Sequence, residues 1–130
     1  MSRKRELATY RAMERMLNHR YFLQYLRSED WKTSDNEADH KEDWEDYFQW
    51  VLMPTLRALE LFSSAVLRDA YSLDVVRVNL GPLFVSIHDN PNVVHAIKHF
   101  EETDEKTVMW AFKRLVEILR TTPNLSLIHI

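Results

Sequence analysis

The sequence contains no cysteine and only one glycine, Gly81, among its 130 residues. Without cysteine the chain has no disulfide framework, no thiol nucleophile and no cysteine-bound zinc, and nothing in it indicates an oxidising compartment. The expected location is therefore the cytoplasm. Glycine is the usual residue of tight hairpin turns and averages about 7% of residues, so its scarcity argues against a sheet protein. Long helices joined by few turns are the expected alternative.

Long apolar runs are also missing, since none approaches the roughly 18 residues that a membrane-spanning helix needs. The basic start Ser2-Arg3-Lys4-Arg5 is not followed by the apolar core of a signal peptide. We therefore expect a soluble chain with no membrane span. Hydrophobic residues make up 45% of the sequence and charged residues 28%, which suffices for one core and a soluble surface. A single helical domain over residues 1–124 follows from this length and composition.

Charge is unevenly distributed along the first third of the chain, although the net charge is only -3. Residues 1–27 carry a charge of about +5, and residues 28–46 carry about -7, by their content of Arg, Lys, Asp and Glu. A nucleic-acid-binding protein normally keeps its basic stripe free. Here the acidic segment directly follows the basic one and can pair with it, so we expect no nucleic-acid partner.

Apolar residues recur at spacings of three and four in five segments, which predicts helices over 3–27, from 37 or 42 to 70, 72–88, 92–102 and 104–121. The expected core-facing residues are Leu7, Tyr10, Met13, Leu17 and Tyr21; Trp44, Tyr47, Phe48, Val51, Leu52, Leu56, Leu59, Phe62, Ala65 and Val66; Leu73, Val76, Leu80, Phe84 and Ile87; Val93, Val94, Ile97 and Phe100; and Val108, Phe112, Leu115 and Leu119.

Proline and capping residues divide these segments. Pro54 predicts a kink or a brief interruption near residues 51–53 of the second helix. Ser72 is a suitable N-cap for the third helix, which Gly81-Pro82 is expected to interrupt. Its β-branched valines leave a hairpin as the alternative. Asp89-Asn90-Pro91-Asn92 predicts a turn. The predicted fold is all-α, an up-and-down bundle of four to five helices with a proline-kinked second helix.

Two histidine pairs could carry metal chemistry. His95 and His99 stand four residues apart on one helix face, the spacing that lets two imidazoles reach one metal ion. His88-Asp89 resembles the paired ligands of the all-helical His-Asp phosphohydrolases, a family that needs a further upstream His and downstream Asp. The alternative function is therefore a metal-dependent hydrolase using a His/Asp cluster on the third and fourth helices. Without any metal, His95 and His99 are explained as partly exposed residues of an amphipathic helix. His88 and Asp89 are explained as the end of a helix.

Other polar patterns indicate structure rather than chemistry. Residues 37–40 contain one Glu-x-x-His motif, where a di-iron bundle needs two. Arg15 and His19 lie on one helix face, as in a basic exposed surface, and Arg57 with Glu60 suggests a structural ion pair. Trp44 and Trp110 fall at core spacing, whereas Trp31 lies in the acidic loop. We predict no catalytic, cofactor-binding or metal-binding residue, and no cofactor.

The last six residues, 125–130, look like a non-native tail. Their sequence, LSLIHI, matches an in-frame translation of the adapter used in transposase-based sequencing libraries. On this hypothesis the natural sequence is cut near Asn124, and the source is an assembled environmental read. His129 is therefore left out of any candidate site.

Residues 43–83 resemble a bacterial family of small helical domains of unknown function, many of which are membrane-tethered. The resemblance depends on the stretch 56–62, LRALELF, and on a turn partly matched by residues 68–74, RDAYSLD. It implies a long helix followed by one that packs back on it, and no catalytic residues. Together these patterns favour a non-enzymatic helical interaction domain with a protein partner or a second copy as its ligand.

Overall fold

The structure, a computed structural model, describes residues 3–18, 45–46, 48–103 and 109–121. Within these ranges it contains five α-helices, one π-helical segment and no strand. They are α1 (Arg3–Leu17), η1 (Phe48–Leu52), α5 (Met53–Leu67), α6 (Leu73–Asp89), α7 (Pro91–Thr103) and α8 (Trp110–Thr121). The predicted all-α bundle of four to five helices is confirmed. The predicted acidic loop, Trp31, Trp44, the Glu-x-x-His motif, His19 and the tail at 125–130 lie outside the described residues.

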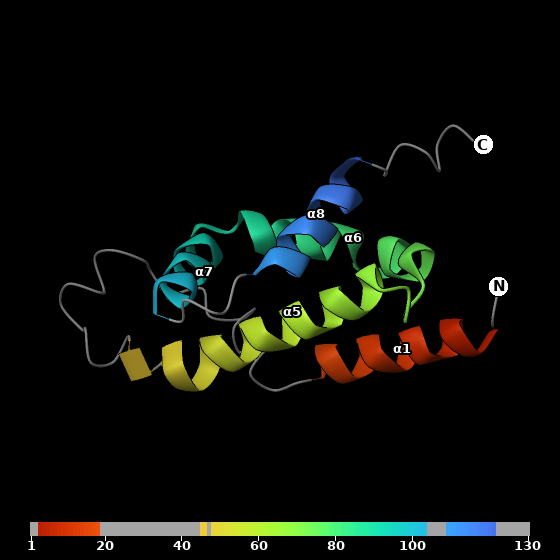
Figure 1. The fold of residues 1–130 in the computed structure, drawn as a ribbon, viewed down its shortest axis with the longest axis horizontal. Coiled ribbons are helices and arrows are strands. Elements are labelled where there is room, and N and C mark those ends of the chain that lie inside the picture. The colour runs from red at the N-terminus through yellow and green to blue at the C-terminus, as the bar shows by residue number, and fades with distance from the viewer. Residues whose placement is uncertain (1–2, 19–44, 47, 104–108, 122–130) are drawn as a thin grey trace.

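One apolar core joins all the described helices. In Figure 1, α5 lies between α1 and α8, and the chain runs in opposite directions along α1 and α5. Helix α8 packs against α5 and α6, while α1 contacts α5 and α6. Phe84, Phe100 and Phe112 are fully buried, and the rings of Phe84 and Phe112 meet edge to face at 5.7 Å. Buried aromatic rings of this size contribute a large share of the hydrophobic stabilisation of a small domain.

Helix α1 buries a face rotated from the one predicted, because Met13 is buried and Leu17 packs against the core as expected, but Leu7 and Tyr10 do not. Leu7 and Tyr10 were expected in the core, but each is about half exposed, at 50% and 51%. The buried residues are Thr9, Ala12, Met13 and Met16. Both sets have helical spacing, and the buried set includes the polar residue Thr9, which is fully buried and hydrogen-bonded inside the bundle. Its hydroxyl accepts the Ser72 N–H at 2.8 Å.

The second predicted helix changes from π-helical to α-helical register just before Pro54. The π-helical segment η1 ends at Leu52, where α5 takes over. Proline has no N–H and its ring collides with the preceding turn of an α-helix, so a local π-helical register accommodates it. A bend of the helix axis stays a prediction. Residues Phe48–Leu67 are long and apolar enough to cross a membrane by length and composition alone, a test that buried core helices also pass.

Helix α6 is continuous, so the expected interruption at Gly81-Pro82 is wrong, and so is the alternative hairpin. Ser72 caps the helix as predicted, and its Oγ accepts the Val75 N–H at 3.3 Å. The helix continues through Pro82 because the proline ring lies on the solvent side. Water can there bond the carbonyl of Val78, whose side chain is 80% exposed.

The last two helices differ from the prediction at their ends. A single residue, Asn90, separates α6 from α7, which agrees with the predicted turn. Helix α8 begins at Trp110 rather than at 104. Val94 and Trp110, both expected in the core, are 52% and 63% exposed, because the buried faces of their helices run through neighbouring residues.

Candidate interaction surface

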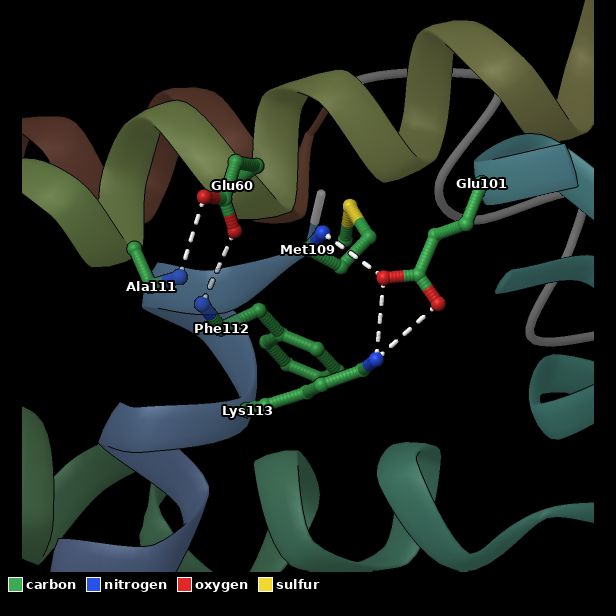
Figure 2. Close-up of polar contacts among 6 residues, drawn as sticks. All are labelled: Glu60, Glu101, Met109, Ala111, Phe112 and Lys113. Carbon is green, nitrogen blue, oxygen red and sulfur yellow. Dashed lines mark hydrogen bonds and ion pairs between the residues drawn. The ribbon is translucent and has the colours of Figure 1, made fainter. Parts of the chain in front are cut away.

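The N-terminus of α8 is held by carboxylates from two other helices (Figure 2). Glu60 of α5 accepts the backbone N–H groups of Ala111 at 3.0 Å and Phe112 at 2.9 Å, one on each oxygen. The first N–H groups of a helix have no partner within the helix, and the helix dipole favours an anion there. Glu60 therefore caps α8 from 51 residues away in sequence.

Glu101 of α7 supports the same end of α8. Its Oε2 accepts the Met109 N–H at 3.3 Å, and both of its oxygens accept from Lys113 Nζ at 2.9 Å. The carboxylates of Glu60 and Glu101 thus face backbone donors and a lysine of α8 (Figure 2). The predicted ion pair between Arg57 and Glu60 is not formed. Glu60 bonds α8, and the Arg57 guanidinium lies 5.8 Å from the centre of the Phe100 ring.

The pair His88-Asp89 is tied to α8 instead of standing open for a metal. Arg120 of α8 donates to Asp89 Oδ1, and His88 Nδ1 lies 3.1 Å from the same oxygen. The bond from Arg120, followed by that from His88, holds the pKa of Asp89 below its ordinary value of 3.8. An arginine at this carboxylate competes electrostatically with any metal cation. The cluster is suited to fastening the C-terminal end of α6 to α8.

The second histidine pair also has structural neighbours. His99 Nε2 lies 3.5 Å from Glu45 Oε1, and its ring meets Phe48 edge-on with centroids 4.6 Å apart. In the described ranges, the structure brings no three His, Asp or Glu side chains together in a group that could hold a metal ion. The four residues His88, Asp89, His95 and His99, predicted as an alternative metal site, therefore do not come together in one group.

Among the described residues, the cavity enclosed by α5, α6 and α7 is too small for a small-molecule substrate. A cavity between α5, α6 and α7 has a volume of only about 10 Å³ and is lined by apolar side chains and Thr55. That volume is at the lower limit for a single water molecule. The Thr55 hydroxyl already donates to the Val51 carbonyl at 2.8 Å. This part of the core is a packed interior.

A surface groove lies between α1 and α5 and has a volume of about 210 Å³. It is lined by Ala12, Arg15, Met16, Ala58, Leu61, Phe62 and Tyr71. The rings of Phe62 and Tyr71 stack in it at 5.5 Å, and Leu61 is 71% exposed. We call these seven residues the α1–α5 groove. Its lining is apolar apart from the Arg15 guanidinium and the Tyr71 hydroxyl, so it suits an apolar side chain better than a reacting polar one.

The sequence did not identify this groove. Leu61 was considered only within the stretch 56–62, and Arg15 only with His19 as part of a basic exposed surface. A usable signal exists, because Leu61 lies off the buried stripe that contains Leu56, Leu59 and Phe62. A large exposed apolar side chain is a candidate contact residue where, like Leu61, it lines a surface hollow. The groove itself, however, forms only because α1 packs beside α5, which periodicity in the sequence does not reveal.

Comparisons with protein-family models, with curated proteins and with solved structures find no match to this chain.

Proposed function

We propose that this protein is a non-enzymatic helical interaction domain that takes an apolar side chain of a protein partner into the α1–α5 groove. The observation that carries the proposal is the exposure of Leu61, at 71%, on the rim of a groove with stacked aromatic rings. Exposed large apolar side chains beside a hollow are typical of protein-binding sites.

The chemistry of the groove defines the partner segment. The apolar lining requires an aliphatic or aromatic anchor residue. Arg15, an exposed arginine of α1, adds a positive charge beside that anchor. A carboxylate next to the anchor would complement it. We therefore expect a short segment with one large apolar residue and a neighbouring Asp or Glu.

Selection of peptides from a random displayed library against the full chain tests this proposal. Selected peptides should carry the expected apolar and acidic pair, and Leu61→Asp should weaken their binding at least roughly tenfold, about 1.4 kcal/mol. Val78→Asp is the matched control, because Val78 is even more exposed, at 80%, but lies on α6 and does not line the groove. Failure to select any peptide, or equal loss in both variants, would contradict the proposal.

The alternative, a metal-dependent hydrolase, has a separate test. Elemental analysis of the purified chain should find zinc, iron and manganese well below one equivalent. A stoichiometric metal that is lost in His95→Ala and His99→Ala variants would favour the hydrolase and overturn the non-enzymatic proposal. The two experiments are independent, since neither variant touches the α1–α5 groove.

A further inference from the structure

The outer face of α1 carries two apolar residues between a basic and an acidic residue, an order that is complementary to its own reverse. Arg3, Leu7, Tyr10 and Glu14 follow at spacings of four, three and four, which places them along one side of the helix. All four are exposed, and Leu7 and Tyr10 are 50% and 51% exposed. From one end the order is basic, apolar, apolar, acidic. From the other end it is the exact charge complement.

We infer that this face of α1 pairs in antiparallel orientation with the same face of α1 in a second copy of the chain. A two-fold axis that crosses the helix between Ala8 and Thr9 brings Leu7 opposite Tyr10 of the second copy and Tyr10 opposite its Leu7. The same axis brings Glu14 opposite Arg3 of the second copy, with Lys4 beside it. Two apolar contacts at the centre are thus flanked by two ion pairs.

None of the other described helices covers this face of α1, since its residues are exposed. Helix α1 lies at the edge of the bundle, on the opposite side of α5 from α8 (Figure 1). Arg3, Lys4, Glu6, Leu7 and Tyr10 line an open depression of about 440 Å³.

This pairing is distinct from the use of the α1–α5 groove. The residues that α1 contributes to the groove are Ala12, Arg15 and Met16, which project from another side of the helix than Leu7 and Tyr10. Both surfaces can therefore be occupied at once. A dimer would present two grooves to a partner and raise its apparent affinity for a repeated ligand.

The expected association is weak. One face of a short helix buries less than the about 800 Å² per partner of a standard interface, so we expect a dissociation constant on the order of 100 µM. Exposed ion pairs are screened over about 8–10 Å, and the association should therefore weaken as salt is raised.

Charge exchange followed by sedimentation equilibrium of the full chain tests the pairing at low ionic strength. Glu14→Arg alone should raise the dissociation constant roughly tenfold, because two like-charged contacts replace two ion pairs. The double variant Arg3→Glu/Lys4→Glu should do the same. Combining all three substitutions in one chain should restore dimerisation, since Arg at 14 again faces Glu at 3 and 4.

The combined variant also distinguishes the orientation, because in a parallel pair position 14 would face position 14 and repulsion would persist. Leu7→Ser should weaken the dimer without unfolding it, as circular dichroism can verify. A wild-type chain that stays monomeric up to about 1 mM, or a dimer that the charge substitutions leave unchanged, would overturn the inference. Neither result bears on peptide binding at Leu61, which is measured separately.

Discussion

Pro82 is a proline inside a helix, and the structure shows why the chain tolerates it. Its ring lies on the solvent side of α6, where water can bond the carbonyl that loses its helical partner. The preceding residue, Gly81, has no Cβ to collide with the proline ring. The proline still lowers the stability of the helix, because an interior proline costs up to about 3 kcal/mol relative to alanine.

Pro82→Ala should therefore stabilise the protein by about 1–3 kcal/mol, since it restores one N–H donor to α6. The measurement is the urea midpoint at unchanged denaturant slope. Pro91→Ala is the matched control. Pro91 is the first residue of α7, where a backbone N–H would have no partner within the helix. Pro91→Ala should therefore lower the stability by less than about 1 kcal/mol. Equal effects of the two substitutions would refute the account of α6.

Asp89 shows how one charged residue links stability to pH. Its pKa in the folded protein lies below 3.8, first because of the hydrogen bond from Arg120 and then because of that from His88. A carboxyl group whose pKa is lowered by folding stabilises the folded state at pH values above its pKa in the unfolded state. This stabilisation is lost as the pH falls through the pKa of the folded state.

Asp89→Asn should accordingly lower the melting temperature at pH 6, and the difference from wild type should shrink as the pH is lowered from 5 to 3. Arg120→Gln should show the same trend. In the double variant the second substitution should add little, because both remove one interaction. A difference that is constant across this pH range would be inconsistent with the bond between Arg120 and Asp89.

At the scale of elements, α8 illustrates the limit of local signals. Its apolar positions Phe112, Leu115 and Leu119 were predicted and are buried. Its start was predicted at residue 104 but lies at Trp110, where Glu60 of α5 accepts the first N–H groups of the helix. A capping side chain 51 residues away leaves no mark in the local sequence.

Glu60→Ala should destabilise the protein by about 1–3 kcal/mol, since it leaves the N–H groups of Ala111 and Phe112 without their carboxylate. Glu60→Gln should cost less, because one oxygen can still accept a bond. Glu117→Ala on the same helix α8 is the control. Glu117 makes only an exposed pair with Arg114, so its removal should change stability by less than about 0.5 kcal/mol. Chemical denaturation of the three variants measures these changes in the free energy of unfolding. A loss in Glu117→Ala as large as that in Glu60→Ala would argue against the cap.

At the scale of the whole molecule, the buried apolar residues of all the described helices form one connected cluster. A single core in a chain of 130 residues should unfold in one cooperative step. Thermal unfolding followed by far-ultraviolet circular dichroism and by tryptophan fluorescence should therefore give the same midpoint. Two separated transitions would show that α1 or α7 folds apart from the remaining helices.

Much of the helical framework could be predicted from the sequence alone. The scarcity of glycine, the helical spacing, the N-cap Ser72 and the turn at 89–92 determine helices through local backbone energetics. Val76, Leu80, Phe84 and Ile87 line the core as their spacing predicts. Only the tertiary structure decided which side of α1 is buried, where α8 begins and that a groove surrounds Leu61. Helix α1 has apolar residues on two faces, and periodicity cannot choose between them. That choice depends on contacts such as the one between Thr9 and Ser72, which join residues 63 positions apart.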